Sequence, residues 1–333
     1  MKKISIYLVF FSILLSFSSC NDEWEDELYV KMVSFKAPVD SEGGSKVYIR
    51  YRENGEGSYN LPVLVSGSKM NESVLDVKIA VDEDTLQALN EAKFLVRDDL
   101  YYRQLEAKHF SFVNPTCHIS PDSCIADFPL KFNFTGIDLS EKWVLPLKIE
   151  DDPSYVVNRR KGWGKALLHI QLFNDYSGTY SATNMKISLS DDPNNTMTVA
   201  NRYCNVHDEN SVFFYAGNVS DRDKNRGLYK VYVKFLPGVE DDKGVIRGRL
   251  IVTGEDGIEF DTTGDQTYEI SSEMDATKPY LKHLYIMMNL NYSYNDITSI
   301  DEEHPLRWVV KGSMTMERKI NTLIPDEDQA IQW

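Results

Sequence analysis

Hydrophobic and polar residues alternate with a period of two along most of the chain. In residues 46–52, "KVYIRYR", Val47, Ile49 and Tyr51 share one side while Arg50 and Arg52 share the other. This alternation is typical of strands that bury one face. It recurs in residues 75–81, 126–134, 143–149 and 165–173. The first half of the chain therefore predicts a β-sandwich.

Two features interrupt this pattern. Pro129 falls on the outer face of its strand and indicates an edge strand or a bulge. Residues 83–92 form a short helical pattern with Asp82 or Asp84 as its cap, and a second helical turn is expected over residues 99–106. We predict an Ig-like sandwich with a short helical insertion over residues 29–173.

The turn-rich segment "NDYSGTY", residues 174–180, marks the predicted domain boundary. Beyond it, strand patterns with short connections lie at residues 228–238, 244–260, 280–294 and 306–318. Successive strands with short connections favour an antiparallel sandwich or barrel over residues 174–333. The predicted fold class is all-β and mainly antiparallel.

The N-terminus has the pattern of an export signal. Lys2 and Lys3 precede an apolar run at 4–17, which is long enough for a secretory signal but too short to span a bilayer. Ser18, Ser19 and Cys20 follow and resemble the lipobox of a bacterial lipoprotein, although Phe17 departs from it. We expect a signal peptide over residues 1–19 and lipid attachment, including palmitate, at Cys20. An ordinary cleaved signal with an incidental cysteine is the alternative.

Residues 20–28 form an acidic tether. Its five acids cannot bury themselves, so the segment should be solvated; they are Asp22, Glu23, Glu25, Asp26 and Glu27. The run resembles the acidic signal that sends Bacteroidota lipoproteins to the outer face of the outer membrane. We therefore expect a lipid-anchored protein of the outer membrane that faces the cell exterior.

The net charge limits the class of partner. The formal charge is −15, and removal of Lys2 and Lys3 with the signal peptide makes it −17. A strongly acidic surface argues against nucleic acid and anionic lipid headgroups, and it is compatible with neutral ligands.

Three cysteines remain after Cys20. Cys117 and Cys124 flank the turn "PD" at residues 121–122, so a disulfide between them is compatible with one strand register only. The third, Cys204, would then stay unpaired. The spacing is not CxxC, and we expect no metal site here.

Catalytic signatures are absent from the sequence. It has no G-x-S-x-G, H-E-x-x-H, P-loop or dinucleotide motif, and no two of its six histidines stand at a metal-ligand spacing. The D-x-D-x-D-x-E motif of family 18 glycoside hydrolases is also missing. We expect no cofactor and no enzyme activity, although abundant carboxylates leave a glycosidase with an unrecognised acid pair open.

Aromatic residues give the best candidates for binding, because sugar CH faces stack on flat rings. Trp163 lies between two glycines in "RRKGWGKA"; it is either a stacking platform or a ring folded back onto the core. The strand end that carries Tyr292, Tyr294, Asn295 and Asp296 is a second candidate, with core-edge packing as the alternative. Trp333 could pack down or contribute to a site.

Several framework segments together resemble one group of proteins. They are "VDEDTLQALNEA", "YYRQLEAKHFSF", "WVLPLKIEDD", "NDYSGTYSA" and "IPDEDQAIQW". They resemble Bacteroidota surface lipoproteins that are encoded with glycan-uptake systems of the starch-utilisation type. The N-terminal domain of that group, of unknown function, also occurs ahead of family 18 endo-β-N-acetylglucosaminidases.

The resemblance implies a non-catalytic, lipid-anchored protein that captures oligosaccharide or polysaccharide beside an outer-membrane transporter and its lipoprotein lid. The first domain would either bind or act as a spacer. The alternative is an adhesive or fimbria-like lipoprotein that binds a protein partner by strand exchange.

Overall fold

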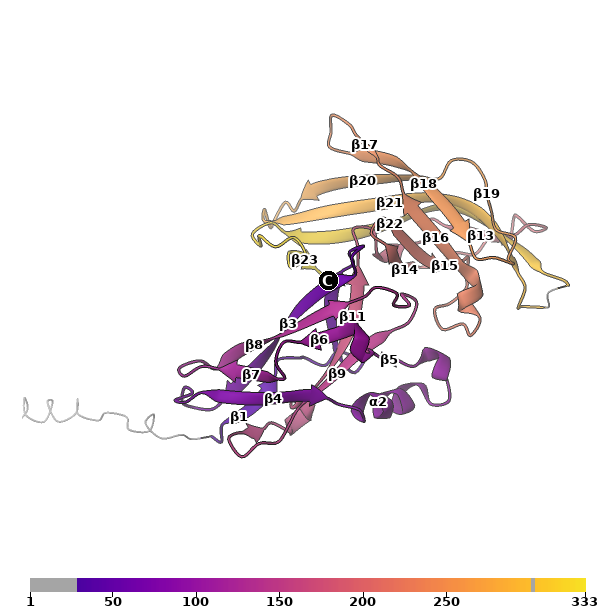
Figure 1. Ribbon diagram of the computed structural model, residues 1–333. Helices are drawn as coiled ribbons and strands as arrows, with labels where there is room; N and C mark the ends of the chain where they lie inside the picture. Colours follow the sequence, from indigo (N-terminus) through magenta and orange to yellow (C-terminus); the bar gives the residue numbers. More distant parts are fainter. Residues whose placement is uncertain (1–28, 301–302) are drawn as a thin grey trace, which may run out of the picture.

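The computed structural model describes residues 29–300 and 303–333, and it consists of two β-structures, one above the other in Figure 1. We call the lower one the sandwich; its strands lie between residues 32 and 173. We call the upper one the barrel; its strands lie between residues 178 and 332. This confirms the predicted all-β, mainly antiparallel fold. The predicted signal peptide, the acidic tether and Cys20 lie outside the described residues.

The first sheet of the sandwich has five strands in the order β10-β1-β3-β8-β6. They are β1 (Met32–Phe35), β3 (Glu56–Ser66), β6 (Phe110–Phe112), β8 (Ile125–Asn133) and β10 (Val156–Val157). Neighbours are antiparallel except β1 and β10. Pro129 lies just beyond the residues of β8 that pair with β6, at a local sheet edge, as its missing N–H favours.

The second sheet of the sandwich has six strands, in the order β2-β11-β9-β4-β7 with β5 paired to β9. They are β2 (Ser45–Arg50), β4 (Leu75–Val81), β5 (Arg103–Gln104), β7 (Thr116–Ile119), β9 (Trp143–Ile149) and β11 (Lys165–Phe173). β2 is parallel to β11, with Ser45 opposite Leu168. The inward residues of both sheets, among them Val47, Leu61 and Phe128, form one buried core.

The helical insertion covers part of the outer face of the second sheet. Helix α2 (Thr85–Phe94) runs about two residues later than predicted. Its Leu86 forms a small separate cluster with Tyr102, Val144 and Leu167. The expected second helical turn over residues 99–106 is wrong: a 3-10 turn (Asp98–Leu100) is followed by β5, because pairing with β9 extends the chain there.

The barrel closes through eight strands. They are β12 (Gly178–Ser181), β14 (Asn201–Asp208), β15 (Ser211–Tyr215), β16 (Lys230–Phe235), β18 (Ile246–Gly254), β20 (Thr267–Met274), β21 (Leu281–Asp296) and β22 (Leu306–Asn321). β22 completes the ring, because it pairs with both β21 and β12. Of the two predicted architectures for this half, the barrel is the one formed.

Four short strands attach to the barrel: β13 (Lys186–Leu189), β17 (Val239–Glu240), β19 (Asp261–Thr262) and β23 (Ile331–Gln332). Side chains fill the barrel interior, and a cavity of about 10 Å³ remains beside Arg202 and Tyr292. That volume matches about one water molecule. Within the part of the chain that the structure describes, no helix is long and apolar enough to cross a membrane.

Candidate functional site

Tyr292 and Tyr294 lie inside the barrel rather than at an exposed strand end. Their exposed fractions are 1% and 0%. The Tyr292 hydroxyl accepts a hydrogen bond from the Gly217 N–H at 3.1 Å, and burial raises the pKa of Tyr292 to about 12. The predicted glycan contact at these two rings is therefore corrected: both are core residues, because β21 continues as a barrel strand to Asp296.

Asn295 and Asp296 stabilise the end of the same strand through hydrogen bonds within the protein. Asp296 accepts hydrogen bonds from the Tyr229 hydroxyl at 2.9 Å and from the backbone N–H of Ser299 at 3.0 Å. Burial alone would raise the pKa of Asp296, but hydrogen bonds from Ser299 and its neighbours outweigh it and lower the pKa. Asn295 donates to Glu259 at 2.8 Å. Both side chains are buried and internally satisfied.

Trp163 is 44% exposed, on a short turn of the sandwich. Lys161 and Gly162 adopt left-handed φ angles of 50° and 72°, and the Lys161 ammonium lies 5.8 Å from the indole centre. The Trp163 carbonyl accepts a hydrogen bond from the Phe35 N–H at 2.9 Å. The ring is accessible, but it lies outside the cleft described below.

The disulfide that one strand register would allow is not formed: Cys117 and Cys124 are both free thiols. Cys117 lies on β7 and is buried in the sandwich core, where burial raises its pKa to about 11. Cys124 lies in the loop before β8, and its sulfur is 3.5 Å from that of Met70. The two thiols therefore face different surroundings.

Trp333 leads to a concave site between the two β-structures. Its ring stacks face to face on Tyr48 of the sandwich, with centroids 4.1 Å apart and an interplanar angle of 2°. Phe173 contacts it edge-on at 4.8 Å. Trp333 is attached to the barrel through β23, so this stack joins the two β-structures. Half of the Trp333 surface remains exposed.

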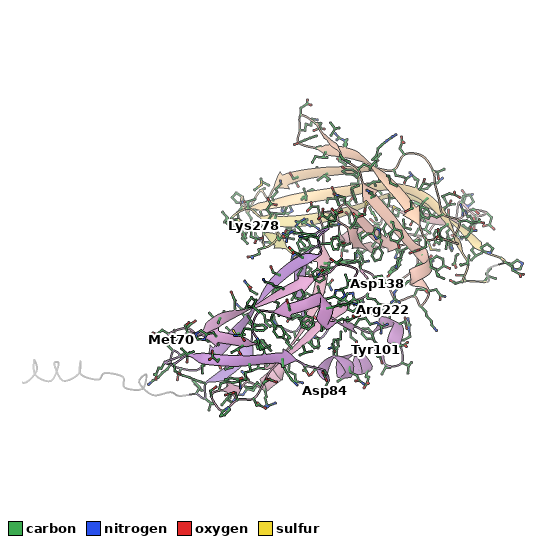
Figure 2. The ribbon with its side chains drawn as sticks, in the orientation of Figure 1. Met70, Asp84, Tyr101, Asp138, Arg222 and Lys278 are labelled. Carbon is green, nitrogen blue, oxygen red and sulfur yellow. The ribbon has the colours of Figure 1, made fainter. Side chains whose placement is uncertain are left out.

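A cleft of about 890 Å³ lies between the sandwich and the barrel, beside this stack. The outer faces of β2 and β11 form one wall and those of β12 and β14 the other, with Lys46, Tyr48 and Gln171 opposite Thr179, Tyr203 and Asn205. Figure 2 shows Tyr101 and Asp138 of the sandwich close to Arg222 of the barrel, on the side of this space where α2 lies.

Tyr203 is the barrel's aromatic contribution to the cleft. It alternates with the buried Cys204 on β14, and so it points outward. Its residue surface is 45% exposed to the cleft, but the surrounding walls desolvate the hydroxyl and, with the nearby Tyr48, raise its pKa to about 12. Tyr48, Trp333 and Tyr203 together are called the aromatic cluster below. Its rings come from both β-structures.

The charges that line the cleft cancel. Its five acidic residues are matched by five basic ones: Glu42, Asp99, Glu141, Asp221 and Glu317 against Lys46, Lys142, Arg202, Arg226 and Arg318. The whole chain, by contrast, has a formal charge of −15. A locally neutral cleft favours an uncharged ligand, because it offers no net field to an ion.

Acidic side chains of the cleft form ion pairs and hydrogen bonds with neighbouring residues. Asp99 forms ion pairs with Arg97 at 2.7 Å and Arg226 at 3.4 Å, and the hydrogen bond from Arg97 lowers the pKa of Asp99 to about 2. Glu317 contacts His283 at 2.5 Å. Hydrogen bonds from His283 to Glu317 and then to Asp275 raise the pKa of His283.

His169 forms part of the floor of the cleft. It is 2% exposed, its ring lies 4.5 Å from that of Tyr102, and burial lowers its pKa. Its Nε2 has no hydrogen-bond partner. Gly44 packs directly against it, since a Cβ there would lie 2.6 Å from Nε2 and from the Leu167 carbonyl.

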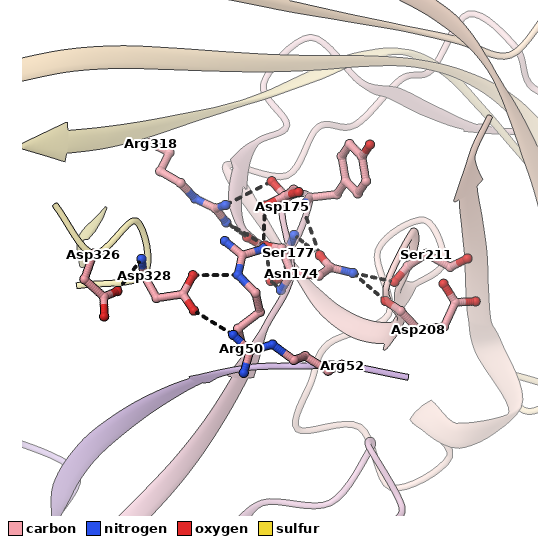
Figure 3. A network of polar contacts seen from close by, with 11 residues as sticks. Arg50, Arg52, Asn174, Asp175, Ser177, Asp208, Ser211, Arg318, Asp326 and Asp328 are labelled. Atoms are coloured by element: carbon pink, nitrogen blue, oxygen red, sulfur yellow. Dashed lines mark hydrogen bonds and ion pairs between the residues drawn. The ribbon is translucent and has the colours of Figure 1, made fainter. Parts of the chain in front are cut away.

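A polar network at the junction fixes the two walls relative to each other (Figure 3). Arg50 of β2 pairs with Asp175 at 2.6 Å and with Asp328 at 2.5 Å. Arg318 donates to three backbone carbonyls, those of Asn174, Asp175 and Ser177. The junction segment is thus bound by both β-structures.

A second bridge lies between the helical insertion and the barrel. Arg226 donates to the Asp99 carbonyl at 2.7 Å, and Arg97 donates to the Arg222 carbonyl at 2.8 Å. With the junction network, this bridge gives the cleft a fixed width, so a ligand would meet a pre-formed site.

Sequence reasoning found Trp333 but missed Tyr48 and Tyr203. A signal for Tyr48 existed: it shares the polar face of "KVYIRYR" with Lys46 and Arg50, where an aromatic residue is out of place for a solvated face. Tyr203 gave no comparable signal, because the strand "NRYCNVHD" has weak alternation.

Comparisons with known proteins give two family matches. A model described as a domain of unknown function (DUF4973) matches residues 24–153, and a model of a C-terminal domain matches residues 164–315. No curated protein matches the chain.

Several solved structures are similar over most of the chain. A protein of unknown function from Bacteroides ovatus is 42% identical, covers 91% of this chain and 100% of its own, and has a TM-score of 0.79. A multidomain protein including DUF1735, from the same species, is 41% identical over 90% and 99%, with a TM-score of 0.78. An auxiliary nutrient binding protein from Bacteroides thetaiotaomicron is 35% identical over 89% and 97%, with a TM-score of 0.77.

Proposed function

The chain belongs to the family of Bacteroides proteins that includes this auxiliary nutrient binding protein, and from that premise we propose that it binds a neutral oligosaccharide without cleaving it. The observation that carries the proposal is the aromatic cluster at the neutral cleft between sandwich and barrel. The chain's similarity to an auxiliary nutrient binding protein supports a binding role of this kind.

Aromatic stacking and hydrogen bonding would both contribute to recognition of the oligosaccharide. The exposed surfaces of Tyr203 and Trp333 offer flat apolar faces to the CH faces of sugar rings. Amide and hydroxyl side chains on the opposing walls, such as Gln171, Asn205 and Thr179, can donate to and accept from sugar hydroxyls. Neutral groups of this kind suit an uncharged glycan.

The carboxylates support binding rather than hydrolysis. A glycosidase needs one carboxylic acid whose raised pKa keeps it protonated as the general acid. Among the described aspartates and glutamates, every pKa that shifts is lowered, as for Asp99 and Asp296. Asp99 is moreover held by two arginines.

We also propose the cellular setting that the N-terminal sequence indicates. Cleavage before Cys20 and acylation of its thiol would anchor the chain in the outer membrane, facing the exterior. A transporter and its lipoprotein lid would take the captured oligosaccharide, and several anchored copies would raise its local concentration. The lipobox-like residues and the acidic run support this part of the proposal.

The test is calorimetric titration of the fragment from Asp22 onward against neutral and charged oligosaccharides, with release of reducing ends measured in parallel. We expect binding of a neutral glycan without release. Tyr203→Ala should weaken binding about tenfold, since a sugar face covers roughly 50 Å² of ring. Trp163→Ala is the matched control, because this equally exposed ring lies outside the cleft.

Reducing-end release would show that the protein is an enzyme. Equal losses in the two variants would remove the cleft from the proposal. Absence of binding to every glycan would favour the adhesive alternative, and protein partners would be sought next.

A further inference from the structure

One end of the sandwich carries a group of exposed apolar side chains. The strand register places three segments together there: the start of β1, where Met32 pairs with Ser66; the start of β8, where Ile125 pairs with Leu64; and the end of β7, where Ile119 pairs with Leu75. We call this end the tip and define it as residues 29–31, 67–74 and 120–125. Figure 2 shows Met70 at this end of the sandwich, away from the barrel.

Five apolar side chains of the tip are exposed to solvent. The exposed fractions are 71% for Tyr29, 62% for Val30, 51% for Met70, 47% for Val74 and 46% for Ile125. Exposed apolar side chains gathered at one end of a soluble protein are a mark of an interaction site.

The tip loops are tied to one another, so the surface is built rather than accidental. Lys31 donates to the Met70 carbonyl at 2.8 Å, and the Asp122 N–H donates to the Asn71 carbonyl at 2.6 Å. Asn71 also donates from its side chain to the Ser120 carbonyl. These bonds hold the three segments of the tip in one surface.

The length of chain that precedes the tip decides which partner meets it. The described structure starts at Tyr29, and Cys20 lies nine positions earlier. Nine residues reach at most about 30 Å when fully extended. This step rests on the proposed lipid anchor: if Cys20 is acylated, the tip can never leave the vicinity of the bilayer.

We propose that the tip docks onto the membrane that holds this anchor, with these apolar side chains in the headgroup region of the bilayer. Tyrosine and aliphatic side chains favour that zone, where a ring can be half in water and half in acyl chains. Docking would direct the cleft, at the other end of the sandwich, away from the membrane.

Cys124 makes the proposal testable on the acylated full chain. It lies in the tip and is partly exposed, whereas Cys117 and Cys204 are buried, so a thiol-reactive dye should label Cys124 in preference to them in the folded protein. The labelled protein is reconstituted into phosphatidylcholine vesicles that contain nitroxide-labelled lipid. The control carries the dye at Val239→Cys in a Cys124→Ser background; Val239 is 77% exposed on β17 of the barrel.

We expect the nitroxide lipid to quench the dye at position 124 and leave the dye at position 239 unquenched. Met70→Glu with Ile125→Glu should abolish the quenching, and the charge-matched pair Val239→Glu with Ile251→Glu should preserve it. Equal quenching at both positions, or none at position 124 in vesicle-bound protein, would overturn the proposal.

A glycan titration on the same vesicles separates the two proposals. Binding of glycan without quenching keeps the cleft and rejects the docked tip. Quenching without glycan binding does the reverse. A chain that does not associate with vesicles at all lacks the anchor, and the docked tip is then rejected with it.

Discussion

Arg318 should hold the two β-structures together, and its replacement by methionine tests this. The side chain is 6% exposed and donates to the carbonyls of Asn174, Asp175 and Ser177 at 3.1, 3.0 and 2.7 Å. It also lies 5.6 Å from the centre of the Trp333 ring. Methionine keeps most of the volume and removes every donor.

The expected loss of stability follows from the backbone carbonyls that lose their arginine donor. A buried acceptor without a partner costs about 1–3 kcal/mol. The residues Asn174 and Ser177 are almost fully buried, and within the described residues only the Asn174 carbonyl keeps another donor, the Ser177 hydroxyl at 3.4 Å. Release of the buried charge offsets part of that cost. We expect a loss of about 3 kcal/mol in the free energy of unfolding, or roughly 6–12 °C in Tm.

Urea denaturation of Arg318→Met beside Arg249→Met provides the assay. Arg249 carries the same substitution at an exposed position on β18, where its side chain is 74% exposed, and should change stability by less than about 0.5 kcal/mol. If the two variants are equally stable, the junction network does not hold the β-structures as argued. Glycan affinity of Arg318→Met should fall as well, because the cleft walls lose their fixed spacing.

Three further outcomes are expected. A double-mutant cycle of Tyr48→Ala and Trp333→Ala should give a coupling of about 0.5–1.5 kcal/mol in unfolding free energy, and additive losses would show that the stack contributes nothing beyond burial. The flanking carboxylates raise the pKa of His283. The stability that this histidine contributes to the fold should therefore be complete below the pKa of the unfolded chain, near 6.5, and lost as the pH rises through the pKa of the folded protein. NMR titration of His283 and pH-dependent unfolding of His283→Gln check this, and a titration without a raised pKa would contradict it. Gly44→Ala should lower the free energy of unfolding by about 1–3 kcal/mol, because the new methyl group meets the Leu167 carbonyl and the buried His169 ring. Gly227→Ala is the control: a Cβ there has no atom within 4 Å and should leave stability unchanged. Equal melting temperatures of the two variants in thermal unfolding would contradict this packing.

Much of the sandwich could be predicted from alternation, because strands such as β4 and β8 bury alternate residues against one core. β4, β9 and β11 match their predicted residues, and β8 nearly so. In the barrel, β16, β18, β21 and β22 follow the predicted segments, whereas β14, β15 and β20 were missed. β15 shows why: the run Ser211–Phe214 is buried on both faces, so it does not alternate.

The site was harder to predict than the fold, because it lies between two structures that one strand pattern cannot place together. Tyr292 and Tyr294 looked like the exposed end of a strand, but the barrel curves over them. Tyr48 and Tyr203 lie far apart in sequence and meet only through the junction, whose geometry depends on Arg50 and Arg318. Alternation indicates which face a residue occupies and is silent on what covers that face.

The parallel pairing of β2 with β11 has a consequence for folding. Leu168 pairs with Ser45, which precedes it by 123 positions, and β1 likewise pairs with β10 near residue 156. Pairing of strands so distant in sequence is a late and slow step in folding. The long intervening chain loses conformational entropy before the new contacts compensate for the loss. The sandwich should therefore form only after residue 173 is available for pairing. Fragments that end before β11 should stay unfolded, with the edge of β9 open to aggregation.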